Sequence, residues 1–384
     1  DDGSVRPAWP RIEDIDADVL FERQGLTVTS RGARVFGTRV QTASARIADL
    51  NHPESTLVVR GSTNGPAADL LATLCETPGP PGREERIREV ARAALADAAD
   101  DVHVDPLGSL VARRAGRGGP RVMLSAHMDE IGFMVRHVEE GGFLRLLPLG
   151  GFDPKTLTAQ RVIVHGREDL LGVLGTKPVH LMSDDEKKRA PKLEDYFVDT
   201  GLPGDRVRAL VRPGDVVTRE RSLARLGDLV TCKSLDNRVG LYVMIEAFRA
   251  LGEHECEIVA VATVQEEVGI RGARVAAARL RPRLGMAIDI TLANDGPDAK
   301  PHERITSVGG GAAVEVDDTS AIVPREVVDH LTAVAEDRGI PHQLEVMSRG
   351  GTDTRELQLS GDGAVAGCVS IPTRYVHQVV EACH

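Results

Sequence analysis

The sequence has little aromatic character, no long apolar run and no paired cysteine motif. Aromatic residues make up 3% of the 384 residues, and Trp9 is the single tryptophan. No apolar segment approaches the ~18 consecutive residues of a membrane-spanning helix, so we expect no membrane partner. The five cysteines are scattered, without a CxxC pair. This pattern is typical of reduced thiols, so we expect a cytoplasmic protein.

Positive charge is also in short supply. Lys and Arg together number 47 against 58 Asp and Glu, which gives a formal net charge of −11. An acidic chain repels a phosphate backbone, so we expect no nucleic-acid partner. The glycine runs at 309–311 and 350–351 lack the spacing of a phosphate-binding loop, and no G-x-S-x-G segment indicates a serine hydrolase.

The sequence does contain several short apolar segments that lead into histidines or carboxylates. The uninterrupted, β-branched run at 258–262 is typical of a strand buried on both faces of a parallel sheet. Similar segments lie at 122–126 and 284–288. Chemistry is commonly placed at the carboxyl ends of such strands. The polar residues that follow these three segments are His127, Asp129, Glu266, Glu267 and Asp289.

Two further residues join this set. Asp236 opens a helical segment at 239–251, and His377 follows the last predicted strand. Two histidines and five carboxylates offer ligands that suit Zn²⁺, Co²⁺ or Mn²⁺. Two histidines and three carboxylates can hold two metal ions that share a bridging carboxylate. Of the two remaining carboxylates, one can act as a general base and the other can orient a histidine.

Taken singly, these features have structural explanations. Asp236-Asn237-Arg238 reads as a helix cap, Glu266-Glu267 as a solvated turn, and a histidine or aspartate at a strand end is common. The metal hypothesis depends on their coincidence at the same ends of successive strands.

The pattern of predicted helices, strands and turns along the chain indicates three regions. Residues 1–66 predict a weakly ordered extension, because aromatic content is low, with a folded module as the alternative. Residues 67–132 and 228–384 alternate helical and strand patterns and predict one discontinuous α/β domain. Between them, residues 133–227 hold short β-like pieces separated by glycine and proline, which predicts an inserted β-rich domain. We find no helical pattern after His377.

Six longer motifs surround these residues. They are AHMDEIG at 126–132, SLDNR at 234–238, VQEEVGIRGA at 264–273, AIDIT at 287–291, GGTD at 350–353 and SIPTRYVH at 370–377. Together they resemble the tetrahedral aminopeptidases, the glutamyl, leucyl and lysyl deblocking enzymes with a dinuclear metal centre. The resemblance spans about residues 67–381, and the segments PLGGFDPKT at 148–156 and KKRAP at 187–191 resemble the inserted dimerisation domain of that family.

The resemblance implies a mixed-sheet α/β/α catalytic domain with an inserted small β-barrel-like dimerisation domain. It also implies a metal-dependent aminopeptidase that acts on short peptides, with two Zn²⁺ or Co²⁺ ions per subunit and dimers that assemble into a homododecamer. The implied roles are a bridging ligand for Asp236, ligands of one metal for His127 and Asp289, ligands of the other for Glu267 and His377, a general base for Glu266, and orientation of His127 for Asp129.

Two other functions remain as alternatives. A polysaccharide hydrolase would also use paired carboxylates, but the motif region has no tryptophan as a sugar platform and the two histidines would lack a role. An inactive or truncated paralogue that acts as a scaffold is the non-enzymatic alternative. Replacement of Glu266 by Gln separates these possibilities.

Overall fold

The computed structural model describes residues 12–22, 25–35, 38–47, 57–64, 67–297 and 299–384. The chain divides into two compact units, residues 1–73 and residues 74–384. Among the described residues, no helix combines the length and the apolar character needed to cross a membrane.

The N-terminal unit contains an antiparallel sheet with the strand order β1-β2-β3-β4. The described residues between 12 and 64 adopt strand conformation, and the weak order expected for residues 1–66 stays a prediction. β-Branched residues such as those in Thr27-Val28-Thr29 favour extended backbone without any need for aromatic side chains. The domain boundaries at 66, 132 and 227 stay a prediction. The strands are β1 (Ile12–Glu22), β2 (Gly25–Val35), β3 (Thr38–Ile47) and β4 (Leu57–Asn64), and α1 (Ala67–Glu76) follows.

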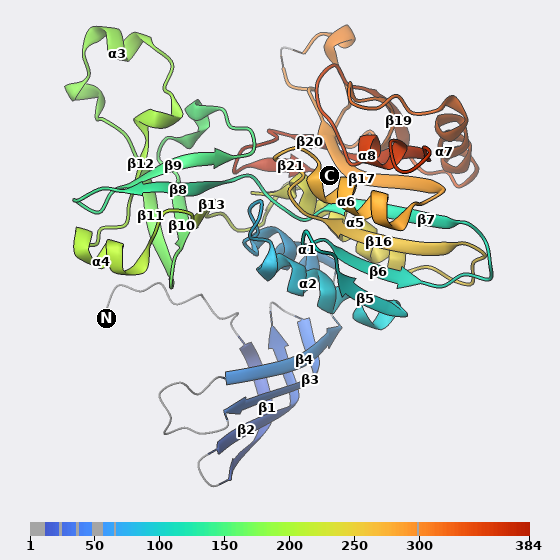
Figure 1. Cartoon of the computed structure of the whole chain (residues 1–384), viewed down its shortest axis with the longest axis horizontal. Coiled ribbons are helices and arrows are strands. Elements are labelled where there is room, and N and C mark those ends of the chain that lie inside the picture. Colours follow the sequence, from blue (N-terminus) through green and yellow to red (C-terminus); the bar gives the residue numbers. More distant parts are fainter. Residues whose placement is uncertain (1–11, 23–24, 36–37, 48–56, 65–66, 298) are drawn as a thin grey trace. The chain divides into compact units, whose positions relative to one another are not determined.

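The second unit contains an 11-stranded mixed sheet (Figure 1). Its main path runs β14-β15-β21-β20-β17-β7-β16-β6-β5, and β18 and β19 join beside β20. The strands are β5 (Asp101–Val104), β6 (Leu110–Arg114), β7 (Arg121–His127), β14 (Ala224–Leu226), β15 (Leu229–Cys232), β16 (Glu257–Thr263), β17 (Leu284–Leu292), β18 (Ala312–Asp317), β19 (His342–Val346), β20 (Val365–Arg374) and β21 (Glu381–Cys383).

Four adjacent strands, β16, β7, β17 and β20, run parallel and form the centre of this sheet. Ala260, Val261 and Ala262 of β16 are completely buried although they point to alternate faces. Both faces are therefore covered, which explains the uninterrupted apolar sequence of this strand. Burial of a side chain the size of Val261 contributes roughly 1.5–3 kcal/mol to stability.

Helices pack on the sheet in two groups. α2 contacts α5, and α5 lies against β7 and β17; α6 contacts α8, and α8 lies against β17 and β20. α7 packs on β18 and β20. The helices are α2 (Glu85–Leu95), α5 (Leu235–Arg249), α6 (Arg271–Leu280), α7 (Arg325–Asp337) and α8 (Thr354–Gln358).

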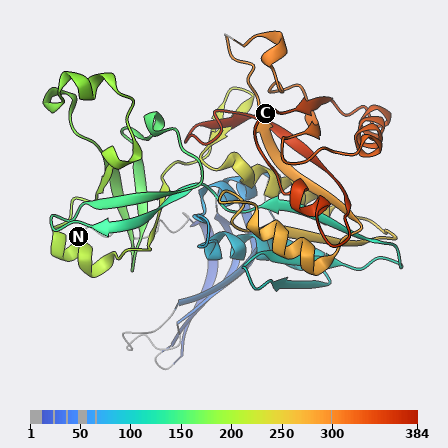
Figure 2. The same cartoon turned by 45° about the horizontal axis from the view of Figure 1, so that its top comes forward.

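A closed barrel with the strand order β10-β11-β12-β9-β8-β13 interrupts the sheet domain in sequence, and it appears in green in Figures 1 and 2. Side chains along its strands alternate between the inside and the outside of the barrel. In β11, Leu170 and Leu174 are buried and the residues directly after Leu170 and before Leu174 are exposed. The strands are β8 (Gly132–Val138), β9 (Leu144–Leu149), β10 (Arg161–His165), β11 (Asp169–Gly175), β12 (Phe197–Asp199) and β13 (Val216–Arg219), and the short helices α3 (Asp184–Lys188) and α4 (Gly204–Leu210) lie between them. A mixed α/β sheet with an inserted β-barrel confirms the predicted fold class.

The last strands form a hairpin that presents His377. β20 turns back through residues 375–380 into β21, where Thr373 pairs with Cys383. β21 also pairs with β15 on its other side, so the residues after His377 form an inner strand of the sheet. His377 thus lies in a loop whose two ends are both fixed by strand pairing.

Candidate metal centre

The parallel strands bring together the polar residues at their carboxyl ends. β7 ends at His127, which pairs with Thr263 at the end of the neighbouring strand β16. Glu266 and Glu267 follow directly after β16, and Asp289 lies in β17 on the other side of β7. Because these strands run in the same direction, their carboxyl ends share one edge of the sheet.

Asp236 lies between the two histidines of the cluster. Its Oδ1 atom is 3.1 Å from Nε2 of His127, and its Oδ2 atom is 3.3 Å from Nε2 of His377. The same nitrogen of His377 is 3.4 Å from Oε2 of Glu267. Ligand atoms of His127, Asp236 and Glu267 all lie within 4.8 Å of one another, and among the described residues they form the single group of this kind.

Two carboxylates approach His127 as well, and a third lies at its other ring nitrogen. Oδ1 of Asp289 is 3.8 Å and Oε2 of Glu266 is 3.9 Å from Nε2 of His127. Oδ1 of Asp129 is 3.5 Å from Nδ1 of the same ring. The structure therefore brings all seven residues singled out from the sequence into one cluster.

Backbone contacts fix the turn that carries the two glutamates. The N–H groups of Glu266 and Glu267 donate to the two oxygens of Asp129 at 3.0 and 3.1 Å. The preceding residue, Gln265, has a positive φ of 56°, a conformation that a side chain disfavours. Its N–H donates to Oε1 of the buried Glu84 at 3.2 Å. Glu84 was missed in the sequence, because a glutamate directly before a helix is most simply explained by the helix terminus.

The electrostatics of the cluster favour a bound positive charge. Burial, reinforced by neighbouring carboxylates, raises the pKa values of Asp289 and Glu266 well above their usual range, although His127 opposes the change. Burial alone would lower the pKa of His377, but Asp236 and Glu267 beside it raise that pKa to about 11. Carboxylates that are buried side by side are stabilised by a cation between them.

An unpartnered ligand atom gives an independent test of metal binding. Oε1 of Glu267 is buried and has no hydrogen-bond partner. Buried polar atoms are normally paired, so such exceptions indicate a missing partner. Imidazole nitrogen and carboxylate oxygen are both good ligands for Zn²⁺ and Co²⁺. The residues present therefore fit a divalent metal.

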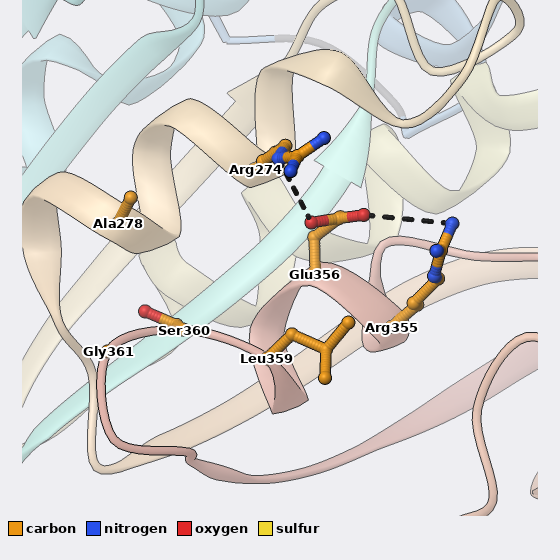
Figure 3. Close-up of a pocket in the computed structure, with 7 residues that line it drawn as sticks. All are labelled: Arg274, Ala278, Arg355, Glu356, Leu359, Ser360 and Gly361. Carbon is orange, nitrogen blue, oxygen red and sulfur yellow. Dashed lines mark ion pairs between the residues drawn. The ribbon is translucent and has the colours of Figure 1, made fainter.

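A hollow lies away from this cluster, between α6 and α8 (Figure 3). It has a volume of about 200 Å³ and none of its lining residues belongs to the cluster. Glu356 is flanked there by Arg274 and Arg355 at 3.8 and 3.9 Å. Because its charged groups already pair with one another, we assign no site to this hollow.

Comparison with known proteins identifies the family. Residues 108–384 match the family described as M42 glutamyl aminopeptidase. The chain is 36% identical over 329 residues to lysyl aminopeptidase of Pyrococcus furiosus, which covers 82% of this chain and 91% of that relative.

Solved structures agree with this match. The aminopeptidase of the archaeon Desulfurococcus kamchatkensis superposes with a TM-score of 0.79 at 36% identity, covering 83% of this chain and 89% of that one. A Pyrococcus horikoshii TET1 peptidase, which can assemble into a tetrahedron or a large octahedral shell, superposes with a TM-score of 0.74 at 32% identity, covering 83% and 94%.

These matches confirm the family resemblance and the enzyme class that the motifs predicted. The chain belongs to the M42 glutamyl aminopeptidase family and is a metalloaminopeptidase, an exopeptidase.

Proposed function

We propose that this protein removes N-terminal residues from short peptides with the help of two divalent metal ions per subunit, Zn²⁺ or Co²⁺. The observation that carries the proposal is the position of Asp236, whose two oxygens face His127 and His377 at 3.1 and 3.3 Å. A carboxylate that directs one oxygen at each of two ligand groups is suited to bridge a pair of metal ions.

The remaining ligands follow from their proximity to the two histidines. Asp289 approaches His127 at 3.8 Å, so these two would complete the coordination of one ion with Asp236. Glu267 approaches His377 at 3.4 Å, so these two would complete the other. Both Zn²⁺ and Co²⁺ accept such mixed nitrogen and oxygen ligands.

Asp129 and Glu266 are the two carboxylates left outside this ligand set. Asp129 lies 3.5 Å from Nδ1 of His127 and would hold the ring so that Nε2 points at Asp236. It also holds the backbone of Glu266 through a 3.0 Å hydrogen bond, which fixes where the Glu266 side chain begins.

Glu266 would be the general base. When bound, divalent ions of this kind lower the pKa of water in contact with them and polarise a carbonyl group. The carboxylate of Glu266 would accept the proton of the attacking water and return it to the leaving amine. The free α-amine of a peptide substrate is positively charged. The excess of carboxylates in the cluster would therefore favour binding of the N-terminal end of a peptide.

The substrate size, assembly and location are also proposals. Relatives that form a dodecamer or assemble into a tetrahedron or an octahedral shell support dimers that assemble into a homododecamer here, and enclosure would restrict access to short peptides. The barrel would be the dimerisation domain. The five cysteines are free thiols in the structure, which supports a cytoplasmic location.

Hydrolysis of a panel of aminoacyl-p-nitroanilides by chelator-treated protein tests the proposal. We expect cleavage to be lost after chelation and restored by Co²⁺ or Zn²⁺, and the panel then reveals the preferred side chain. Metal analysis of the same samples should give two ions per subunit. Cleavage that survives complete metal removal, or none with any metal in protein shown to be folded, would contradict the proposal.

A further inference from the structure

The loop that presents His377 has an unusual backbone conformation. His377 has a φ of 66° and Tyr375 a φ of 59°, both in the left-handed region that side chains disfavour. Such conformations persist where surrounding contacts hold them. The contacts that hold His377 come from two other parts of the chain.

Glu381 binds the amide side of this loop. One of its oxygens accepts the N–H of His377 at 2.9 Å, and the other accepts the N–H of Asp236 at 3.0 Å. Glu381 is 1% exposed. A single buried carboxylate therefore links the backbones of two metal-ligand candidates without contributing a ligand itself.

Arg219 binds the carbonyl side of the same residue. It lies at the end of β13 in the barrel, is 2% exposed, and donates from Nη1 to the carbonyl oxygen of His377 at 3.0 Å. Its guanidinium lies 5.4 Å from the centre of the Phe152 ring, so a barrel aromatic supports it from one side. Both backbone groups of His377 are thus held by buried charged side chains.

The barrel also touches the imidazole ring of His377. Gly151, in the segment after β9, lies so close that a Cβ atom there would be 3.3 Å from Nδ1 of His377. Phe152, the next residue, is the one that supports Arg219. Two adjacent residues in the segment after β9 therefore lie beside the ring of His377 and beside the arginine that binds its carbonyl oxygen.

We propose that Arg219 and Glu381 are positioning residues for His377, and that the inserted barrel thereby sets the affinity of the metal site that His377 completes. The inference rests on the proposed function, since it takes His377 as a ligand. Arg219 and His377 are 158 positions apart in sequence, so their contact exists only when the barrel is seated on the sheet domain. The contact is made to a candidate ligand of one metal ion, so the loss of Arg219 is expected to act on that site.

A purely structural role for Arg219 as a tether of the barrel can be separated from this one. Arg86 of α2 also joins the sheet domain to the barrel, through two hydrogen bonds to Asp169 at 2.5 and 2.9 Å. That tether involves none of the ligand candidates. Arg86→Met is therefore a matched control that removes one link between the sheet domain and the barrel and leaves the Arg219–His377 contact in place.

The experiment is a titration of the chelator-treated full chain with Co²⁺, followed by calorimetry and by the visible absorption of bound Co²⁺. For the wild type we expect two sites. Arg219→Met is expected to weaken one site by about 10–100-fold and leave the other unchanged. Glu381→Gln is expected to weaken both sites, because Glu381 holds the backbone of Asp236, the proposed shared ligand, as well as that of His377. Arg86→Met should bind as the wild type does. Equal weakening of both sites by Arg219→Met, or the same effect from Arg86→Met, would overturn the proposal.

Two further variants keep the result unambiguous. His377→Ala should lose one of the two sites; if it keeps both, the ligand assignment of the proposed function is wrong. If His377→Ala loses a site and Arg219→Met and Glu381→Gln bind normally, the present inference alone fails.

Should Arg219→Met fail to fold, Gly151→Ala replaces it, because the added methyl group presses on the His377 ring and should weaken the same site. Normal Co²⁺ binding by Gly151→Ala would then overturn the role of the barrel.

Discussion

Oδ1 of Asp236 lies 3.1 Å from Nε2 of His127, across the carboxyl edge of the central strands. The other oxygen of Asp236 is directed at His377. One side chain thus connects the residue at the end of β7 with the residue in the final hairpin, and its loss should affect both halves of the site.

We expect Asp236→Ala to abolish binding of both metal ions, because the variant removes the shared ligand. Asp289→Ala is the matched comparison and should lose one ion, since Asp289 approaches only the His127 side, at 3.8 Å. Metal content per subunit after dialysis against limiting Co²⁺ measures the difference. If Asp236→Ala retains one tightly bound ion, Asp236 does not bridge the pair.

Glu266→Gln should retain the metals and lose peptidase activity. The amide keeps the size of the side chain but cannot accept the proton of the attacking water. A positioned general base contributes about 10²–10⁴-fold to the rate, so we expect kcat to fall by that factor with metal content unchanged. Steady-state kinetics and metal analysis on one preparation provide the measurement. An unchanged kcat would remove Glu266 from the role of base.

Glu130→Ala should strongly destabilise the fold. Glu130 is fully buried, 2.6 Å from Nζ of Lys233 and 3.6 Å from Nη2 of Arg238, so its removal leaves two buried cations unpaired. Loss of one partner of a buried ion pair costs roughly 3–5 kcal/mol. Glu89→Ala is the control, because Glu89 is 66% exposed and pairs with Arg92 at the surface, where about 0–1 kcal/mol is expected. Urea denaturation compares the free energies of unfolding.

Asp169→Asn should destabilise the protein at neutral pH and much less in acid. Burial alone would raise the pKa of Asp169, but hydrogen bonds with His165 and Arg86 hold it well below its ordinary value. A carboxylate with a lowered pKa contributes stability above its unfolded pKa, and that contribution is lost as the pH falls through the folded pKa.

The wild type should therefore exceed Asp169→Asn by about 1–3 kcal/mol near neutral pH. The difference should shrink as the pH falls below about 4. Denaturation at several pH values measures this trend. Asp205→Asn, at a side chain that is 97% exposed, should change stability by less than about 0.5 kcal/mol at any pH. A difference for Asp169→Asn that grows in acid would contradict the assigned cause.

Much of the site could be predicted from the sequence, because several of its residues directly follow apolar strand segments. His127 and Asp289 lie at the ends of apolar segments, and the two glutamates follow another. A parallel sheet gathers such ends at one edge whatever the details of packing. The inserted barrel was also visible, because alternation and frequent glycine are local features of short barrel strands.

Other features gave no local signal. Glu381 and Arg219 are charged residues in strands, and nothing beside them in sequence indicates that both bind the backbone of His377. The strand β21 was not predicted, because its three residues are too few to show a period.

By itself, the sequence determined which side chains stand at the strand ends, and through its motifs the family to which the chain belongs. Only the tertiary structure decided that Asp236 lies between His127 and His377, and that Arg219 of the barrel holds the carbonyl of a residue 158 positions away. The physical reason is that periodicity and turn residues encode local backbone conformation. The pairing of buried polar groups depends instead on which surfaces meet when distant segments pack.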